Sequence, residues 1–222
     1  MNYQHRYADG SPADLPVGKV VCVGRNYAEH AKELNNPVPT EPLLFLKPST
    51  AIVPLAESIV LNPSRGPVHY ETEIALLIGS TLSGEVNEAE ATAAIAGVGL
   101  ALDLTLRELQ DQLKAKGHPW ERAKAFDGAC PLSVFIPATS APQLDDIALQ
   151  LRINGEVRQQ GRSAQMITPI AILLQQISTV FTLLPGDVVI TGTPAGVGIL
   201  HAGDRLDLSI PGQLELSTSV QG

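Results

Sequence analysis

The chain has few cysteines, few aromatic residues and a deficit of basic residues. Its 222 residues include two cysteines, and aromatic side chains make up 4% of the chain. Cys22, in KVVCVG, and Cys130, in GACPL, stand among apolar residues, so we expect buried free thiols and no disulfide framework. Lys and Arg number 15 against 23 Asp and Glu, which gives a formal charge of −8. A nucleic-acid or anionic-membrane partner would favour an excess of basic residues, so the composition argues against both.

Long hydrophobic runs are also missing. No segment approaches the roughly 20 apolar residues of a membrane span, and the opening MNYQHRYADGSPADLP lacks the layout of a secretory signal. We therefore expect a cytoplasmic protein whose partner is a small molecule. Apolar residues make up 44% of the chain, which is enough for a sizeable core. We predict that residues 1–18 form an irregular lead-in and that residues 19–222 form a single domain.

Short strands joined by turns dominate the predicted secondary structure. Apolar and alternating runs predict strands at 19–24, 41–47, 58–62, 69–79, 97–105, 132–136, 147–153, 156–161, 186–192, 204–210 and 213–220. Helices are predicted at 26–34, 86–97, 106–117 and 168–178, the first of them capped by Asn26. Residues 118–130 are predicted as a loop. Asn154-Gly155 and Pro211-Gly212 are typical of hairpin turns. Hairpins mixed with isolated helices favour a β-rich α+β fold over a doubly wound parallel sheet.

Three carboxylates form a candidate metal site. Glu71 and Glu73 are two residues apart on the predicted strand 69–79, so they point to the same face, roughly 7 Å apart at Cα. Asp103 lies near the end of the apolar strand GLALDLT, where an ionised carboxylate is costly unless it is paired or binds a metal. An all-oxygen set favours Mg²⁺, Mn²⁺ or Ca²⁺ over zinc. The alternatives are a solvated edge-strand face for the two glutamates and a cap or salt bridge for Asp103.

A histidine and a glutamate form a second candidate pair. His30 and Glu33 are three residues apart on the predicted helix 26–34, so their side chains meet there. A carboxylate beside an imidazole raises its basicity and fixes its tautomer, and such a pair can activate water. The helix follows a buried strand through Gly24-Arg25-Asn26, where site loops tend to lie. The alternative is an ordinary exposed helix face.

Several polar residues are positioned to bind an anion. Lys47 ends an apolar strand and Lys124 lies in the predicted loop, and either can balance a carboxylate cluster or an anionic substrate. Arg107 and Gln110 share a helix face just after Asp103. The turn TGTPAGVG offers free backbone N–H groups and threonine hydroxyls, a suitable cradle for a carboxylate. The alternatives are snorkelling lysines, a plain polar helix face and an ordinary glycine turn.

Six motifs in this order resemble the fumarylacetoacetate hydrolase family. They are GRNYAEHAKEL, FLKPST, HYETEIALLIG, ALDLTLRELQ, KGHPWERAKAFDGACP and VVITGTPAGVG. The resemblance runs from about residue 18 to the C-terminus. It is to the short single-domain branch of the family, which contains acylpyruvases and oxaloacetate-processing enzymes. It implies one catalytic domain with the mixed β-sheet roll and peripheral helices of the family's C-terminal domain, and a homodimer.

The resemblance also implies the roles of individual residues. Mg²⁺ or Mn²⁺, with Ca²⁺ as a substitute, would be bound by Glu71, Glu73 and Asp103. The catalytic residues would be His30, Glu33 and Lys124. The substrate-binding residues would be Arg25, Lys47, Arg107, Gln110 and Thr193.

The function implied by the resemblance is metal-dependent cleavage of the C–C bond of acylpyruvates, with oxaloacetate decarboxylation as an additional reaction. Fumarylpyruvate hydrolysis, an oxo-acid decarboxylase or isomerase of aromatic catabolism, and oxaloacetate tautomerisation are the alternatives within the same class. A catalytically silent metal-binding protein and a purely structural protein are the alternatives outside it. The His30–Glu33 pair favours an enzyme over both. The substrate in each enzymatic reading is a 2-oxo acid.

Overall fold

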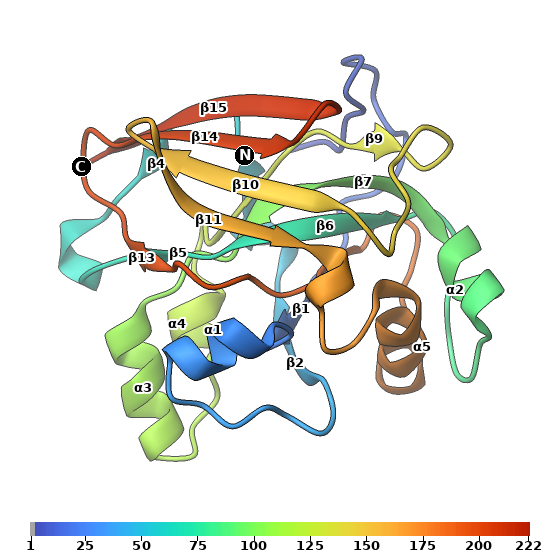
Figure 1. The fold of residues 1–222 in the computed structure, drawn as a ribbon, viewed down its shortest axis with the longest axis horizontal. Coiled ribbons are helices and arrows are strands. Elements are labelled where there is room, and N and C mark those ends of the chain that lie inside the picture. The colour runs from blue at the N-terminus through green and yellow to red at the C-terminus, as the bar shows by residue number, and fades with distance from the viewer. Residues whose placement is uncertain (1–2) are drawn as a thin grey trace.

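Two β-sheets face each other across the main hydrophobic core (Figure 1). The computed structural model describes residues 3–222. The larger sheet has the strand order β2-β1-β12-β6-β7-β8-β3, with β9 paired to β7. Its strands are β1 (Val20–Gly24), β2 (Leu43–Lys47), β3 (Ile52–Pro54), β6 (Thr72–Ile78), β7 (Ile95–Leu102), β8 (Cys130–Leu132), β9 (Ile136–Pro137) and β12 (Val188–Ile190).

The second sheet has five strands in the order β11-β10-β14-β15-β4, and β5 pairs with β13 in a short ribbon. These strands are β4 (Ile59–Val60), β5 (His69–Tyr70), β10 (Ala148–Ile153), β11 (Glu156–Arg162), β13 (Gly198–Ile199), β14 (Arg205–Ile210) and β15 (Leu214–Gln221). The hairpin β10–β11 turns at Asn154 and Gly155, both with positive φ, as the two-residue turn requires. The predicted hairpins are therefore confirmed.

Five helices lie at the margins of the sheets within residues 3–222 (Figure 1). They are α1 (Ala28–Glu33), α2 (Glu88–Ala93), α3 (Arg107–Ala115), α4 (Glu121–Lys124) and α5 (Ile170–Val180), with 3-10 turns at Ser49–Ala51, Pro63–Arg65 and Ser163–Gln165. Helices α1, α3 and α4 gather near one end of the larger sheet, and α2 and α5 near the other. The strand-rich α+β architecture predicted from the sequence is confirmed.

Strand β6 is central and is buried on both faces. Its odd residues Ala75 and Leu77 pack in one cluster, and Ile74 and Leu76 pack in the core between the sheets. The predicted alternation is correct, but the strand lies between β12 and β7 and not at an edge. The alternative that Glu71 and Glu73 occupy a solvated edge-strand face is therefore excluded.

Several local predictions are wrong. The helix predicted at 86–97 ends at Ala93, and Ile95 already begins β7. Asn26 does not cap α1, whose N-cap is Tyr27, because the Asn26 amide bonds to the backbone of Thr168 and Thr191. The segment 118–130 contains the one-turn helix α4, in which Ala123 is fully buried. The strand predicted at 132–136 is divided into β8 and β9, because the Ser133 hydroxyl accepts from Leu100 N–H and donates to the Val134 carbonyl, which interrupts the ladder.

The first residues cover the outer face of the larger sheet. Tyr7 and Leu15 pack against the smaller core cluster, the one that contains Ala75 and Leu77 of β6. His5 is fully buried, with Nε2 3.0 Å from the Gly186 carbonyl oxygen. Residues 3–18 form isolated β-bridges but contain no helix and no strand of two or more residues. No helix in residues 3–222 is long and apolar enough to cross a membrane.

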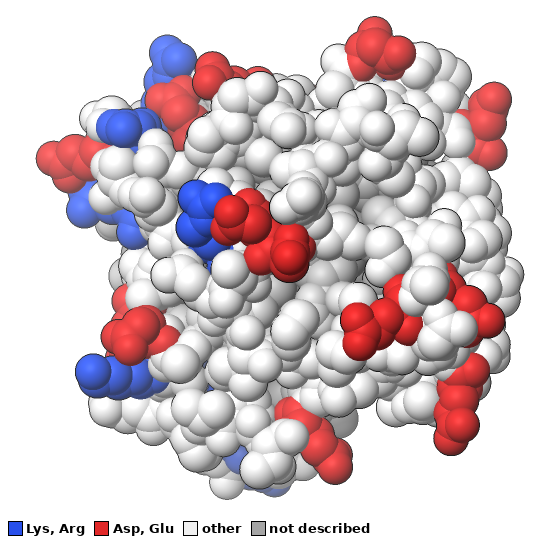
Figure 2. Space-filling model, turned by 45° about the vertical axis from the view of Figure 1, so that its right-hand side comes forward, with Lys and Arg blue, Asp and Glu red and all other residues white. Residues whose placement is uncertain are grey.

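Figure 2 shows the charge on one face of the molecule. Acidic side chains are spread over this face, and basic side chains gather along its left margin. The acidic excess of the composition is thus visible at the surface. An anionic ligand must therefore be attracted by cations placed inside a pocket and not by the protein's overall charge.

Candidate functional site

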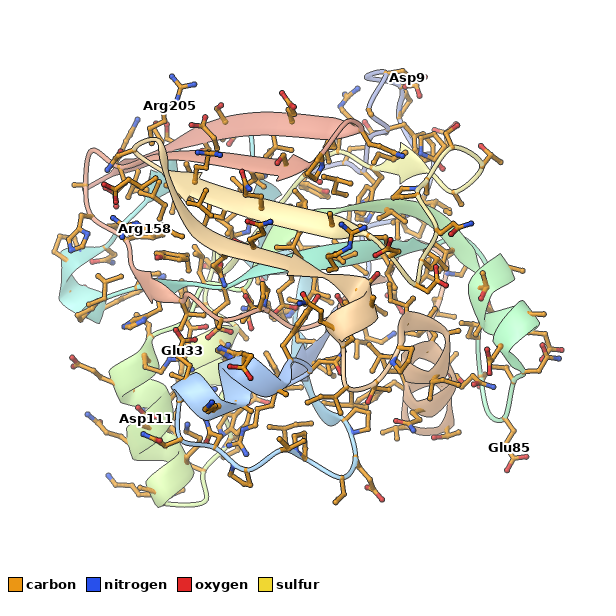
Figure 3. The ribbon with its side chains drawn as sticks, viewed as in Figure 1. Asp9, Glu33, Glu85, Asp111, Arg158 and Arg205 are labelled. Atoms are coloured by element: carbon orange, nitrogen blue, oxygen red, sulfur yellow. The ribbon has the colours of Figure 1, made fainter. Side chains whose placement is uncertain are left out.

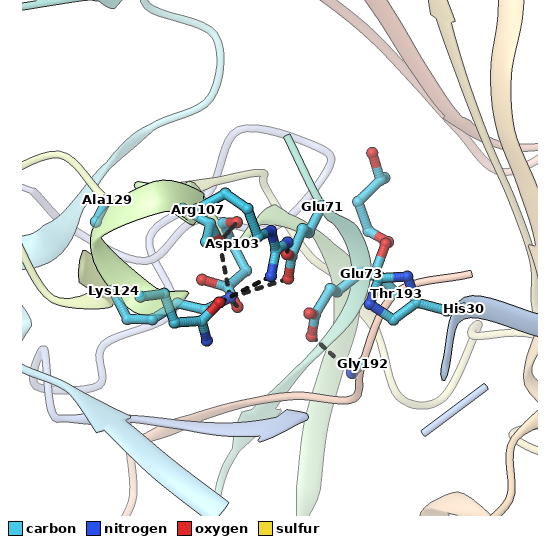
Figure 4. Close-up of polar contacts among 12 residues, drawn as sticks. His30, Glu71, Glu73, Asp103, Arg107, Lys124, Ala129, Gly192 and Thr193 are labelled. Atoms are coloured by element: carbon cyan, nitrogen blue, oxygen red, sulfur yellow. Dashed lines mark hydrogen bonds and ion pairs between the residues drawn. The ribbon is translucent and has the colours of Figure 1, made fainter. Parts of the chain in front are cut away.

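Three carboxylates meet at one end of the paired strands β6 and β7 (Figure 4). Glu71 directly precedes β6, Glu73 is its second residue, and Asp103 directly follows β7. The strands pair antiparallel, and the Asp103 amide donates to the Glu71 carbonyl oxygen at 2.8 Å. The strand register therefore brings Asp103 beside the two glutamates. One ligand atom of each side chain lies within 4.8 Å of those of the other two, and all three residues are buried.

The two charges on Glu73 and Asp103 are stabilised very differently. Glu73 accepts a hydrogen bond from the Gly192 amide at 2.6 Å and forms no ion pair with a lysine or arginine of residues 3–222. Burial, and secondly the Asp103 carboxylate, raise the pKa of Glu73 well above its usual range. Burial also acts to raise the pKa of Asp103, but Lys124 and Lys47 outweigh it and lower that pKa. Glu73 is thus the carboxylate that lacks a cation.

Lys124, at the end of α4, neutralises the other two carboxylates. Its Nζ lies 2.9 Å from Glu71 Oε2, 2.6 Å from Asp103 Oδ2 and 2.7 Å from Thr105 Oγ1. These contacts use the three donors of an ammonium group. The Phe45 ring covers the same group, with its centroid 5.2 Å from Nζ. The predicted loop is helical here, and the first turn of α4 is what aims Lys124 at the carboxylates.

Lys47 lies behind the carboxylate cluster and contacts Asp103. It is fully buried, its Nζ lies 2.8 Å from Asp103 Oδ1, and it donates to the carbonyl oxygens of Lys124 and Ala129. It does not line the pocket described below. The structure thus places Lys47 behind Asp103, and its predicted contact with the substrate stays a prediction.

Arg107 and Gln110 share one face of α3, as predicted. The Arg107 guanidinium forms an ion pair with Glu71 Oε1, and its Nη1 donates to Gln110 Oε1 at 2.8 Å. Glu71 therefore has two cations, Arg107 and Lys124, one on each carboxylate oxygen. The guanidinium is placed where it can also contact a ligand of the carboxylate cluster.

His30 and Glu33 form the predicted contact on α1. His30 Nδ1 lies 3.3 Å from Glu33 Oε2, and the other oxygen of Glu33 accepts from the Gly196 amide at 3.0 Å. Burial is the main reason that the pKa of His30 lies below 6.5, although Glu33 acts to raise it. His30 is therefore a neutral imidazole at pH 7, buried against the pocket and held by an anchored carboxylate.

Thr193 is held in place by a residue that the sequence analysis missed. The Gln159 amide, on β11, donates to Thr193 Oγ1 at 2.7 Å and to the Pro194 carbonyl oxygen at 2.9 Å. Its carbonyl oxygen accepts from the Thr72 amide at 2.9 Å. Gln159 is almost fully buried, so it ties the second sheet to the turn and to β6. Nothing in the surrounding sequence EVRQQGR distinguishes Gln159 from Gln160.

One pocket brings most of the predicted site residues together. Its lining includes Arg25, His30, Glu71, Glu73, Asp103, Arg107, Gln110, Lys124 and Thr193. Glu33 stands behind His30, and Lys47 stands behind Asp103. The lining also contains Phe45, Trp120 and Lys114, which the sequence analysis did not select. Trp120 packs edge to face on Phe45, so these two rings form an apolar part of the pocket wall beside Lys124.

The donor set fits a divalent metal ion. Three carboxylates within reach of one another supply the oxygen ligands that Mg²⁺, Mn²⁺ and Ca²⁺ prefer, and the cluster contains no cysteine or histidine. Asp103 Oδ1 has no well-directed hydrogen bond, although Lys47 lies near it. Glu73 has no lysine or arginine partner among the described residues 3–222. A buried carboxylate of this kind is costly unless a charge is added, so the acidic triad can hold a divalent ion.

The fold and this pocket define an enzyme family. Residues 19–221 match the fumarylacetoacetate (FAA) hydrolase C-terminal family. The chain belongs to the fumarylacetoacetate hydrolase family, as a short member of it. It is 51% identical over 221 residues to oxaloacetate tautomerase YcgM of Escherichia coli (strain K12), a match that covers 98% of this chain and 99% of that protein.

Solved structures of related proteins have the same fold. A fumarylacetoacetate hydrolase family protein from Yersinia pestis CO92 is 49% identical, with a TM-score of 0.95 over 98% of this chain and 100% of that one. A fumarylpyruvate hydrolase from Pseudomonas aeruginosa, crystallised with Mn²⁺ and pyruvate, is 36% identical, with a TM-score of 0.91 over 99% of this chain and 95% of that one. The family resemblance and the fold inferred from the six motifs are confirmed.

Proposed function

We propose that this chain interconverts the keto and enol forms of oxaloacetate with the help of a Mg²⁺ or Mn²⁺ ion. The observation that carries the proposal is the 51% identity to an oxaloacetate tautomerase over nearly the full length of both chains. Glu71, Glu73 and Asp103 would hold the ion. The comparisons thus favour a function that the sequence analysis placed behind C–C hydrolysis.

When bound, the ion would supply Lewis acidity to the 2-oxo acid end of the substrate. Tautomerisation itself needs a proton to leave C3 while negative charge forms on the 2-oxo oxygen. Lys124 and Arg107, which face the carboxylate cluster, would stabilise that charge. Thr193 and Gln110 would fix the orientation of the substrate carboxylate. The apolar wall of Phe45 and Trp120 would exclude water from this side.

His30 is the group best suited to move the C3 proton. With Nδ1 donating to Glu33, Nε2 carries the free lone pair of the neutral ring. The electron pair of the C3–H bond becomes the second bond between C2 and C3, the C2=O π pair moves to the 2-oxo oxygen, and the proton passes to Nε2. The protonated ring then gives up this proton, directly or through water, to the 2-oxo oxygen, which completes the enol. The enol returns to the keto form by the same steps in reverse. This cycle consumes nothing, as a tautomerase requires.

Ultraviolet absorbance of the enol tests the proposal. In the presence of Mg²⁺, the purified protein is expected to accelerate the decay of enol oxaloacetate to its equilibrium level far beyond the rate in protein-free buffer with the same metal. The same preparation is tested with acetylpyruvate and fumarylpyruvate. A rate with oxaloacetate that equals the protein-free rate would contradict the proposal.

The pH profile tests the role of His30. Because its pKa lies below 6.5, the neutral base persists at lower pH, and the acidic limb of kcat/KM is expected below pH 6.5. Glu33 acts to raise this pKa, so Glu33→Gln should move the limb to still lower pH, with a smaller plateau because the ring tautomer is no longer fixed. Glu29→Gln, an exposed change on the same helix, serves as the control. A limb above pH 6.5, or one that Glu33→Gln moves upward, would argue against this role.

Hydrolysis of acylpyruvates is the second candidate function. The observation that favours it is the 36% identity to a fumarylpyruvate hydrolase crystallised with Mn²⁺ and pyruvate, together with the His30–Glu33 pair, which can activate water. In this reaction water adds to the distal carbonyl and the C–C bond breaks to release the enolate of pyruvate. Formation of pyruvate from acetylpyruvate or fumarylpyruvate in the same substrate panel would support it, and its absence would leave tautomerisation as the single activity.

A further inference from the structure

Helix α3 presents three polar residues to the pocket in one line. Arg107, Gln110 and Lys114 are spaced i, i+3 and i+7, so they follow one face of the helix, and all three line the pocket. The Arg107 side chain is 14% exposed and that of Lys114 is 27% exposed. Arg107 therefore lies at the deep end of this line, beside Glu71, and Lys114 lies toward the mouth.

A second cation without a carboxylate of the triad as partner, Arg25, lines the same pocket as Lys114. Arg25 directly follows β1, lines the same pocket and has a φ of 60°, a left-handed conformation that is uncommon for arginine. It forms no ion pair and no side-chain hydrogen bond with any residue of 3–222. The left-handed turn directs the chain from β1 into α1 and places Arg25 at the pocket.

We propose that Lys114 and Arg25 bind the second carboxylate of a dicarboxylic 2-oxo acid and thereby select the substrate. This inference rests on the proposed function and names the substrate class it serves. The inner cations belong to the 2-oxo acid end: Lys124 contacts Glu71 and Asp103, Arg107 contacts Glu71, and the proposed function assigns both to the 2-oxo oxygen. The charges left for a distal carboxylate are those at the mouth.

The spacing along α3 suits a short dicarboxylate. Gln110 and Lys114 are four residues apart, a rise of about 6 Å along the helix axis. A four-carbon dicarboxylate whose 2-oxo acid end lies near Gln110 would therefore direct its other carboxylate toward Lys114. The apolar wall of Phe45 and Trp120 has no charge to offer that group. A monocarboxylic 2-oxo acid would leave Arg25 without an ionic partner and Lys114 with Asp111 alone.

Lys114 has one competing partner, Asp111. Lys114 Nζ lies 2.7 Å from Asp111 Oδ1, but the Asp111 side chain is 58% exposed. Figure 3 labels Asp111 on α3 and Glu33 on α1, the helices that carry Lys114 and His30 to the pocket. An exposed pair between neighbours on one helix is weak, so it leaves Lys114 able to bind a ligand.

Calorimetric titration of the Mn²⁺-loaded protein tests this inference without relying on turnover. The two probes are oxaloacetate, which has the second carboxylate, and pyruvate, which lacks it. Lys114→Gln and Arg25→Gln are each expected to weaken oxaloacetate binding about tenfold and to leave pyruvate binding unchanged. Asp111→Asn should tighten oxaloacetate binding, because it removes the competing carboxylate. Lys116→Gln, an exposed change on the same helix end, should alter neither.

The outcomes separate this inference from the proposed function. Equal losses for both probes, or an unchanged Kd for oxaloacetate, would overturn the role of Lys114 and Arg25. Failure of the wild-type protein to accelerate tautomerisation would overturn the proposed function, while the ratio of the two Kd values would still decide whether the mouth recognises a second carboxylate.

Discussion

Glu73→Gln is expected to lower kcat/KM for oxaloacetate about a thousandfold, because it replaces one of the three carboxylates proposed to hold the metal with a neutral amide, and such a metal contributes several kcal/mol to a reaction of this kind. The same change should not destabilise the metal-free protein. Glutamine keeps the volume and can still accept the Gly192 hydrogen bond, while it removes a buried carboxylate whose ionised form burial disfavours. Loss of activity without loss of stability would therefore identify Glu73 as a functional ligand.

Two measurements on the same preparation check this prediction. Urea denaturation in the presence of chelator gives the free energy of unfolding, expected to be unchanged within about 0.5 kcal/mol or raised. The enol assay gives kcat/KM. Glu215→Gln on β15 is an exposed control that should change neither. A variant that keeps wild-type activity with Mg²⁺ would remove Glu73 from the metal site.

Lys47→Met is expected to lower the free energy of unfolding by about 3–5 kcal/mol, which is typical when one partner of a buried ion pair is removed. Lys47 is fully buried, and its ammonium serves Asp103 and two backbone carbonyl groups at once. Methionine fills a similar volume but removes the cation beside Asp103 Oδ1 and the lysine donor of the Lys124 carbonyl oxygen, while the Ala129 carbonyl oxygen keeps the Leu104 amide. Lys124 still contacts Asp103 in this variant, so the lost stability comes from the buried contacts of Lys47 behind the site.

Denaturant unfolding of the Lys47→Met protein measures this loss, with Lys116→Met as the exposed control of the same chemical change. The control should lie within about 0.5 kcal/mol of wild type. A loss below about 1 kcal/mol for Lys47→Met would show that its charge does not support Asp103.

The sequence predicts the parts of this site that depend on local spacing. Alternation in HYETEIALLIG places Glu71 and Glu73 on one face, and helical spacing pairs His30 with Glu33 and Arg107 with Gln110. The structure confirms these relations because each depends on residues a few positions apart. The resemblance to the family then predicts that these separate pairs belong to one site.

Relations between distant segments could not be read from spacing. Lys47 has the apolar context of a strand end, but only the approach of Asp103 and of the residues near Ala129 shows that its ammonium faces inward. Gln159 is one of two adjacent glutamines, and the pairing of β11 decides which of them reaches Thr193. Lys114 looks like any lysine of a polar helix until the pocket is seen. The homodimer and the boundary at residue 18 stay predictions.

Calorimetric titration of Mn²⁺ into the metal-free protein tests the central claim, that the acidic triad binds a divalent ion, most directly. The wild-type chain is expected to bind one ion, and Glu73→Gln is expected to bind it at least about a hundredfold more weakly, because a carboxylate ligand is lost. No saturable binding by the wild-type chain, or equal affinity in the two proteins, would contradict the account.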